Sequence, residues 1–238
     1  TLADMEGVPP VETTGQVRWF KRPTPGHTYM VSLDPSMGTG GDFAAIQVFE
    51  LPTFEQVGEW HHNTTPMNHQ VRILQGITKH IHDTIIEKDA SATPQIFYSM
   101  ENNSIGEAAL LRVMDIGEEN IMGMFLSEPI RKGHRRKFRR GFNTTAKHKI
   151  DACTKFKELV ENDKMKINSS LLISELKDFV ASGMTYSAKP GQHDDLVSSC
   201  LLMTRMMKVL ADFDPKIFEK WTDRQSEITP MPIFGTFT

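Results

Sequence analysis

The run Met30-Val-Ser-Leu-Asp-Pro-Ser36 decides the fold that this sequence predicts. Apolar and small residues lead up to Asp34, and the Pro-Ser that follows begins a glycine-rich turn, Met37-Gly-Thr-Gly-Gly41. The pattern predicts a buried strand that ends on an acidic side chain. A carboxylate in that position is unfavourable unless something compensates its charge, because ions avoid low-dielectric surroundings. Asp34 is therefore the first candidate functional residue.

Acidic residues occupy comparable positions at two further places. Glu101 ends the apolar run Ile96-Phe-Tyr-Ser-Met100, and Asp194 and Asp195 open a helical pattern in Gln192-His-Asp-Asp-Leu-Val197. Carboxylates that converge repel one another, and divalent cations are their usual compensation. Such a site suits two-metal phosphodiester hydrolysis, in which ions about 4 Å apart stabilise the attacking and leaving oxygens. We predict that these four acidic residues form one catalytic, metal-binding site.

Hydrophobic periodicity predicts an α/β architecture. Strands are expected over residues 27–34, 43–50, 55–61, 94–100 and 121–126, with a further short strand at 16–21. This order predicts a mixed sheet, with three antiparallel strands plus two parallel strands, flanked by helices. Asp34 and Glu101 can meet only if strands 27–34 and 94–100 are neighbours, and we predict that pairing.

Helices are expected over residues 65–85, 104–114, 145–162, 174–181 and 193–210. The Thr65 hydroxyl is expected to cap the first of them, and Ser104-Ile-Gly-Glu107 has the spacing of a capping box. In the last helix, a stripe that includes Met203, Met206 and Met207 is expected to fill the core.

The composition is that of an ordinary globular domain, with 39% hydrophobic and 24% charged residues in a chain of 238. Because the net charge is −3, nucleic-acid binding would have to depend on a local basic patch. The two cysteines, Cys153 and Cys200, form neither a disulfide framework nor a metal cluster, which fits a reducing compartment. The sequence contains neither the apolar run of a membrane helix nor the phosphate-binding loop of a P-loop ATPase.

Five motifs, in this order and spacing, carry a resemblance to a known family. They are Leu33-Asp-Pro-Ser-x-Gly-x-Gly-x-Asp42, Met100-Glu-Asn-Asn103, Gly141-Phe-Asn-Thr-Thr145, Glu175-Leu-x-x-Phe179 and His193-Asp-Asp-Leu-Val197. Together they resemble the nuclease domain of tailed-phage terminase large subunits, over most of the chain. The resemblance implies an RNase H-like fold, two Mg²⁺ or Mn²⁺ ions, and endonucleolytic cutting of concatemeric double-stranded viral DNA during packaging.

The resemblance also implies roles for individual residues. Asp34 matches the metal ligand of the first strand, which we expect to bridge both ions, and Glu101 matches the ligand of the fourth strand. Asp194 and Asp195 match the third acidic position, and spacing does not settle which of them is the main ligand.

The implied partners are duplex DNA, bound largely without sequence preference, an ATPase domain of the same protein, the portal ring and the small terminase subunit. The implied location is the host cytoplasm, at the procapsid during packaging, without a membrane. The chain opens on Thr1. We therefore expect residues 1–26 to be a linker from an absent upstream ATPase domain, 27–211 the nuclease domain and 212–238 a C-terminal tail.

Other candidate residues have two interpretations each. Asp42 either shapes the hairpin before the second strand or contacts the ions or their ligands, and His193 either caps the last helix or contacts a metal ligand, which we favour, or binds a metal ion itself. A basic run follows strand 121–126, and it is either a solvated loop or, as we favour, a contact to the DNA backbone. Its charged members are Arg131, Lys132, Arg135, Arg136, Lys137, Arg139 and Arg140.

Three other functions are weighed against a terminase nuclease. An actin/hexokinase-like ATPase module would use Asp34 and its glycine-rich turn to bind phosphate, but the second phosphate-binding hairpin of that class is absent from the sequence. A non-catalytic portal-docking module would not need an intact set of acids. Another RNase H-like nuclease, such as a junction resolvase or transposase, would differ in its preference for branched over linear DNA.

Overall fold

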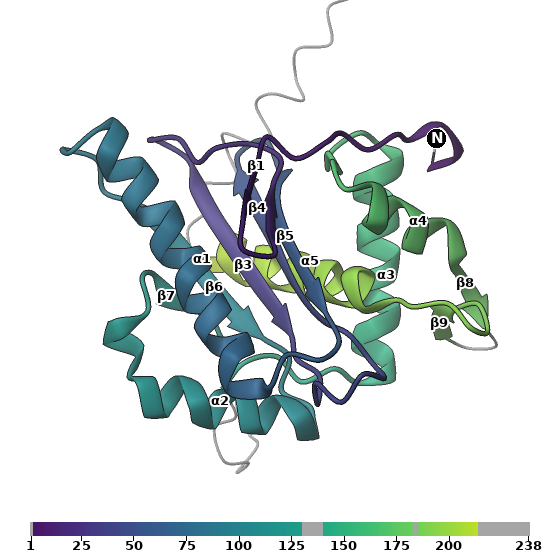
Figure 1. Ribbon diagram of the computed structural model, residues 1–238. Coiled ribbons are helices and arrows are strands. Elements are labelled where there is room, and N and C mark those ends of the chain that lie inside the picture. The colour runs from purple at the N-terminus through teal and green to yellow at the C-terminus, as the bar shows by residue number, and fades with distance from the viewer. Residues whose placement is uncertain (1, 130–139, 183–184, 214–238) are drawn as a thin grey trace, which may run out of the picture.

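The computed structural model describes residues 2–129, 140–182 and 185–213, and its centre is a seven-stranded sheet (Figure 1). The strands lie in the order β1-β2-β5-β4-β3-β6-β7. Their bounds are Glu12–Thr14 (β1), Val17–Trp19 (β2), Thr28–Asp34 (β3), Ala44–Leu51 (β4), Glu55–His62 (β5), Gln95–Met100 (β6) and Met124–Phe125 (β7). β3, β4 and β5 form an antiparallel meander, whereas β6 and β7 run parallel to β3. The predicted mixed sheet is confirmed.

The register of β3 against β6 determines where the acidic residues lie. Leu33 is paired with Met100, and the backbone N–H of Glu101 donates to the carbonyl oxygen of Leu33 at 3.2 Å. Asp34 and Glu101 therefore follow paired residues at the same end of two adjacent parallel strands. This is the pairing that the sequence predicts.

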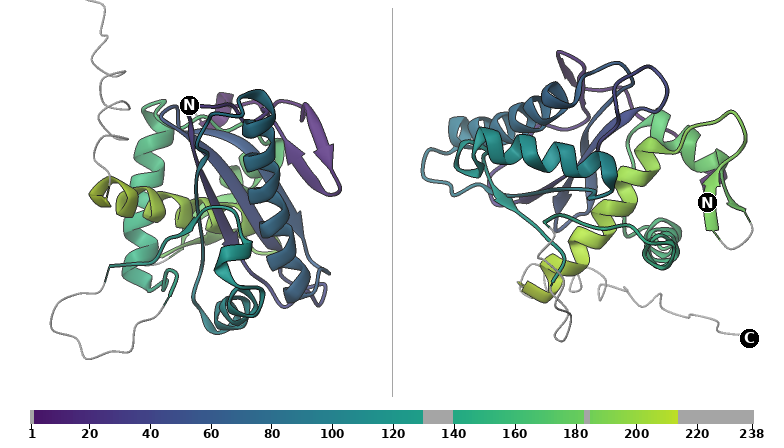
Figure 2. Two further views of the ribbon diagram at one scale, coloured as in Figure 1. Left: turned by 90° about the vertical axis from the view of Figure 1, so that its left-hand side faces the viewer. Right: turned by 90° about the horizontal axis from the view of Figure 1, so that it is seen from below.

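Helices cover both faces of the sheet (Figure 2). One face carries α1 (Met67–Lys88) and α2 (Ser104–Ile116), and the other carries α3 (Ala146–Glu161), α4 (Ser170–Asp178) and α5 (Asp195–Phe213). Because side chains alternate across a strand, Met30 of β3 packs in the core beneath α3–α5, while Val31 and Leu33 pack beneath α1 and α2. Burial on both faces explains the nearly continuous apolar run that precedes Asp34. The methionine stripe of α5 is buried in the first of these cores, as expected.

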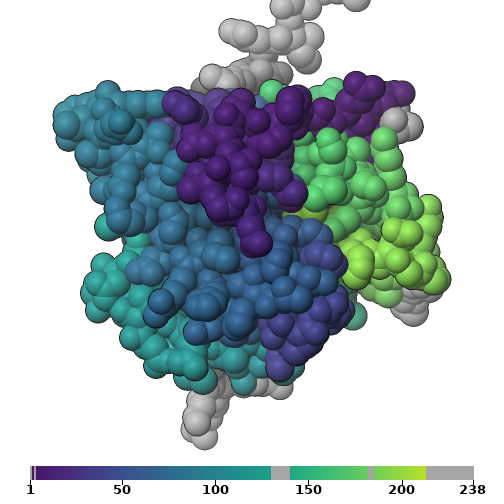
Figure 3. Space-filling model, in the orientation of Figure 1, coloured from purple at the N-terminus to yellow at the C-terminus, as the bar shows by residue number. Residues whose placement is uncertain are grey.

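Part of the segment expected to be a linker packs on the sheet. β1 and β2 pair with each other, and β2 extends the sheet beside β5, with Trp19 opposite Gly58. The short strand predicted at 16–21 is therefore β2, with a partner strand before it. The N-terminal residues, including the 3-10 helix η1 (Leu2–Asp4), cross the surface toward the region that precedes α4 (Figure 3). There the N–H of Val8 donates to the carbonyl oxygen of Asn168 at 2.8 Å.

The predicted caps of two helices are wrong. The N-cap residue of α1 is Pro66, which has no side-chain group that could cap the helix. The Thr65 hydroxyl, which was expected to be the cap, hydrogen-bonds Nδ1 of His62 at 2.7 Å instead. α2 is capped by Asn103, whose side-chain oxygen accepts the N–H of Gly106 at 2.8 Å. The expected capping box at Ser104 is therefore shifted by one residue, since an Asn side chain fills the cap position equally well.

The helix predicted at 174–181 also differs from the structure. α4 begins at Ser170, with Ser169 as its cap, and ends at Asp178. The following residues form a hairpin of β8 (Phe179–Ser182) and β9 (Thr185–Ala188) outside the main sheet. The aromatic and β-branched residues at the start of this segment favour a strand over a further helical turn.

The 3-10 helix η2 (Glu118–Asn120) follows α2. Cys153 and Cys200 are both free and buried. Within the described ranges, no helix has the length and apolar character needed to span a bilayer.

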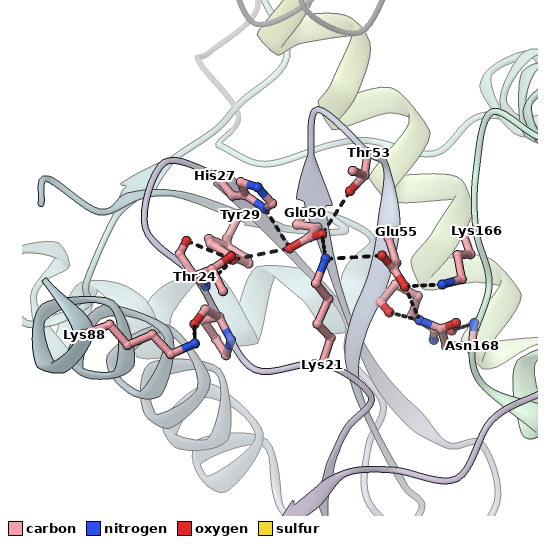
Figure 4. Close-up of polar contacts among 12 residues, drawn as sticks. Lys21, Thr24, His27, Tyr29, Glu50, Thr53, Glu55, Lys88, Lys166 and Asn168 are labelled. Atoms are coloured by element: carbon pink, nitrogen blue, oxygen red, sulfur yellow. Dashed lines mark hydrogen bonds and ion pairs between the residues drawn. The ribbon is translucent and has the colours of Figure 1, made fainter. Parts of the chain in front are cut away.

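A polar cluster fixes the sheet at the end opposite Asp34 (Figure 4). The Glu50 side chain of β4 is fully buried and hydrogen-bonds Nζ of Lys21, Nδ1 of His27 at 2.9 Å and the Thr53 hydroxyl at 3.0 Å. Burial acts to raise the pKa of Glu50, but the hydrogen bonds and charges of Lys21 and His27 outweigh it and lower that pKa. A buried acid can thus be neutralised by basic partners from its own chain.

Candidate active site

Asp34 is the last residue of β3 and lies at the base of a surface cavity of about 120 Å³. The residue is partly buried, and its carboxyl group is within hydrogen-bonding contact of the Glu101 carboxyl group. The glycine-rich turn after Asp34 is held against the start of α1, because Gln70 donates from Nε2 to the carbonyl oxygen of Ser36 at 2.9 Å. Gly38 approaches so closely that an added Cβ would lie 2.2 Å from the carbonyl oxygen of Thr65.

Glu101 follows β6 and lines the same cavity. Its backbone is fixed on one side by β3 and on the other by Phe142, with which it forms a parallel bridge. Nδ2 of Asn103 donates to its carboxylate at 3.3 Å. The start of α2 also packs directly on Glu101, since a Cβ added to Gly106 would lie 1.8 Å from the Glu101 carbonyl oxygen. Glu101 therefore has little freedom to move away from Asp34.

Asp194 and Asp195 lie at the start of α5, which crosses the sheet on the face of α3 and α4 (Figure 1). Oδ2 of Asp194 accepts from the N–H of Ala188 at 3.4 Å and lies 3.7 Å from Nζ of Lys149. The Asp195 carboxylate accepts from the backbone N–H of Phe43, at the start of β4. Both acids are close enough to Asp34 to affect its ionisation.

The electrostatics of Asp34 are the reverse of those of Glu50. Burial raises the pKa of Asp34 well above its ordinary value, and Glu101, Asp195 and Asp194 raise it further. Burial likewise raises the pKa of Asp195 to about 6, with Asp194 adding to the effect and His193 opposing it. The basic partners that neutralise Glu50 have no counterpart among the groups that shift the pKa of Asp34. The charge of Asp34 is therefore not compensated by basic partners in the way that the charge of Glu50 is.

Two basic side chains line the cavity beside the acids. Arg205 of α5 is held on several sides, by the Glu128 carboxylate, by the carbonyl oxygen of Asn143 at 3.0 Å and by the Thr144 hydroxyl at 2.9 Å. Lys149 of α3 has a longer ion pair with Asp194 and lies 5.8 Å from the centre of the Phe179 ring. Both cations therefore lie in the same cavity as Asp34 and Glu101.

Sequence reasoning gave no role to Glu175, which lies near the start of α5, or to His61, which lies beside Glu175. Glu175 of α4 accepts from the N–H of Val197 at 3.1 Å, and Nε2 of His61 lies 3.8 Å from its other oxygen. Burial raises the pKa of Glu175 to about 8 and lowers the pKa of His61 to about 4. Glu175 was visible in the motif Glu175-Leu-x-x-Phe179, whereas nothing in the sequence around His61 distinguishes it from other strand residues.

Some of the remaining candidate residues lie among those that the structure describes, and others do not. Asp42 is exposed and close enough to Asp195 to raise its pKa, and Nδ1 of His193 lies 3.5 Å from Oδ2 of Asp195. Of the predicted DNA-binding run, only Arg140 is described. It pairs with Glu118, and its guanidinium carbon lies 5.3 Å from the centre of the Phe125 ring. The other members, Arg131, Lys132, Arg135, Arg136, Lys137 and Arg139, lie outside the described residues.

The donor set fits hard divalent cations. Carboxylate oxygens are the ligands that Mg²⁺ and Mn²⁺ prefer, and the uncompensated charge around Asp34 favours binding of a cation. Across residues 2–129, 140–182 and 185–213, no three His, Cys, Asp or Glu side chains already surround a single point as ligands would. Mutual repulsion among ionised carboxylates opposes such convergence before a cation binds.

The family described as Terminase RNaseH-like domain matches residues 31–206. Among solved structures, the large terminase nuclease from thermophilic phage G20c with bound magnesium is similar, with a TM-score of 0.62 and 17% identity over 85% of this chain and 93% of that chain. The same nuclease has also been solved with cobalt and with zinc. The nuclease domain of Thermus phage P74-26 large terminase has a TM-score of 0.59 and 17% identity, covering 85% of this chain and 91% of that chain.

A viral enzyme from outside the phages has a similar fold. The human cytomegalovirus terminase nuclease domain, Mn-soaked and inhibitor-bound, has a TM-score of 0.52 and 12% identity, covering 76% of this chain and 82% of that chain. At these identities the neighbours show that the fold is shared.

Proposed function

Because this chain belongs to the family of terminase RNase H-like domains, we propose that it is the nuclease domain of a phage DNA-packaging terminase and cuts concatemeric double-stranded DNA. The observation that supports this most directly is the uncompensated charge around Asp34, whose pKa is raised by burial and by three other acids. Such a cluster is unfavourable for folding alone and suits a site that binds divalent cations.

In this proposal the acids hold two divalent cations, Mg²⁺ or Mn²⁺. Asp34 would be a ligand of both, Glu101 would be the second ligand, and one or both of Asp194 and Asp195 would complete the set. The chemistry that the cations supply is activation of an attacking water and stabilisation of the leaving 3′ oxygen. The contribution of the chain is rigid placement, because Asp34 ends a central strand and Glu101 is held between that strand and Phe142.

Basic residues position the DNA. Lys149 contacts the phosphate that is cut, since it lines the same cavity as Asp34 and Glu101 and its ion pair with Asp194 is as long as 3.7 Å. Arg205 is tied to Glu128 and Asn143, so it contributes a fixed positive charge. The basic run that ends at Arg140 contacts the DNA backbone farther from the cut, through sequence-independent and salt-sensitive contacts.

The wider context follows from the family. Residues 1–26 connect to an ATPase domain of the full-length protein and also contribute β1 and β2 to the nuclease sheet, residues 27–211 form the rest of the nuclease, and residues 212–238 are a tail. The full-length protein acts at the procapsid in the host cytoplasm, with the portal ring and the small terminase subunit as partners.

Cleavage of supercoiled plasmid in Mn²⁺ and in Mg²⁺ tests the proposal. The parent chain is expected to cut, and Asp34→Asn to abolish cutting while remaining folded. Asp89→Asn is a matched control, because Asp89 is an exposed acid beyond the distal end of α1, and this variant is expected to cut like the parent. A parent chain that cuts no DNA in either cation would overturn the function, and an active Asp34→Asn would overturn the site.

A further inference from the structure

At the start of α5, the carboxylates of the cap-position residue, Asp194, and of the first helical residue, Asp195, both bind groups outside the helix. A helix begins with backbone N–H groups that have no partner within the helix, and an Asp at the cap position commonly accepts one of them. Asp194 instead accepts from Ala188 and faces Lys149, and Asp195 accepts from Phe43. The backbone carbonyl of Asp194 still begins the helix, since it accepts from the N–H of Ser198 at 2.7 Å.

Glu175 of α4 takes over the capping function. Its Oε2 accepts from the N–H of Val197 at 3.1 Å, and its carboxylate also hydrogen-bonds the N–H of Leu196. These are two of the amides left free at the start of α5. The Glu175 side chain is only 11% exposed, so its contact with α5 is shielded from water.

We propose that Glu175 is a positioning residue that holds Asp194 and Asp195 toward the cation site by capping α5 in their place. Because the free amides are satisfied from another helix, neither acid needs to turn back onto its own backbone. This inference rests on the proposed function, in which those acids hold cations.

His61 and Phe43 complete a support around Asp195. Nε2 of His61 lies 3.8 Å from Oε1 of Glu175 and has no hydrogen-bond partner among the described residues. The Phe43 ring stacks on the His61 ring with centroids 4.1 Å apart, and the N–H of Phe43 is the group that holds the Asp195 carboxylate. A shift of Glu175 would therefore disturb Asp195 from two directions, through the start of α5 and through the stacked His61 and Phe43 rings.

Calorimetric titration of the whole 238-residue chain with Mn²⁺ tests this role without relying on cleavage. Glu175→Met keeps the length of the side chain but cannot accept the amides, and we expect it to weaken Mn²⁺ binding at least tenfold, as loss of a ligand-orienting partner does. Glu175→Gln retains an acceptor oxygen, so its affinity is expected to stay within about twofold of the parent. If Glu175→Gln binds Mn²⁺ like the parent and Glu175→Met does not, then position 175 needs a hydrogen-bond acceptor for the amides and does not need a negative charge.

Ile85→Val serves as the matched control for stability, because it trims a buried residue of α1 on the opposite face of the sheet. It should lower the melting temperature and leave Mn²⁺ affinity unchanged. If Glu175→Met melts lower yet binds Mn²⁺ like the parent, the residue is only structural and the proposal is wrong. If Glu175→Met does not fold, Glu175→Asp is tested in its place, because it keeps a carboxyl group that is too short to reach the amides. If neither variant folds, the proposal is also overturned.

The parent chain separates this inference from the function on which it rests. If the parent binds no Mn²⁺, the proposed function itself fails. If the parent binds Mn²⁺, Asp34→Asn does not, and Glu175→Met still does, only the positioning role is lost.

Discussion

Replacing Asp195 with Asn should stabilise the protein when no divalent cation is present. Burial, assisted by Asp194 and Asp42, raises the pKa of Asp195 from 3.8 to about 6. At about 1.4 kcal/mol per pKa unit, ionisation disfavours the folded state by about 3 kcal/mol, which we reduce to about 2 kcal/mol because solvent screens a partly exposed group. The Asn side chain keeps an oxygen that can accept the Phe43 N–H, so the substitution removes mainly the charge.

The sign of the effect depends on pH. Asp195 ionises near pH 3.8 in the unfolded chain and near pH 6 in the folded protein, so the folded state binds more protons between these values. Its stability therefore falls as the pH rises through this window, and the penalty is complete above pH 6. The advantage of Asp195→Asn should be absent below about pH 4 and full by about pH 8, as measured by urea denaturation in EDTA.

Glu50→Gln is the control with the opposite sign. The same acid-to-amide change should destabilise the protein by about 1–3 kcal/mol, because it leaves the partly exposed Lys21 and His27 facing a neutral group. If Asp195→Asn gains no stability at pH 8, or gains equally at pH 4, the argument from uncompensated charge is refuted. The same holds if Glu50→Gln stabilises the protein.

Three further predictions concern the site. Asp34→Asn should melt no lower than the parent at pH 8 in EDTA, because it removes a disfavoured charge, and a large drop in melting temperature would show that the Asp34 carboxylate is structural. Lys149→Met should slow DNA cleavage by at least about tenfold, because a positive charge next to the phosphate is lost. The melting temperature should change little, because the Lys149–Asp194 pair is partly exposed. Unchanged cleavage would exclude a role for Lys149 at the phosphate. Gly106→Ala should destabilise the protein by about 1–3 kcal/mol in urea titrations and weaken Mn²⁺ binding, because the new Cβ would lie 1.8 Å from the carbonyl oxygen of Glu101. If this variant has the stability and Mn²⁺ affinity of the parent, α2 is not packed tightly on Glu101.

The parts of the fold that sequence predicted well are those with strong local signals. β3 is nearly continuous in its apolar pattern and ends at an Asp-Pro turn, so both its position and its end could be predicted. The pairing of β3 with β6 followed from requiring Asp34 and Glu101 to meet, and the register bears it out. The acids could be chosen as candidates because each ends or follows a buried strand or opens a helix, where an uncompensated charge is unexpected.

The parts that escaped prediction depend on contacts between distant segments. The cap of α5 comes from Glu175, which is 22 residues away from Val197 in sequence, so no local capping pattern reveals it. The Thr65 hydroxyl had the right chemistry for a cap, but His62 competes for it. β1 is only three residues long, too short for alternation to distinguish it from a linker.

The most direct test of the central claim is a crystal of the chain soaked in Mn²⁺, with anomalous scattering used to locate the ions. Peaks between the carboxylates of Asp34 and Glu101, reached also by Asp194 or Asp195, are predicted, and Asp34→Asn crystals treated identically should lose them. Peaks confined to other surfaces, with none touching Asp34, would contradict the claim that this acidic cluster is a cation site.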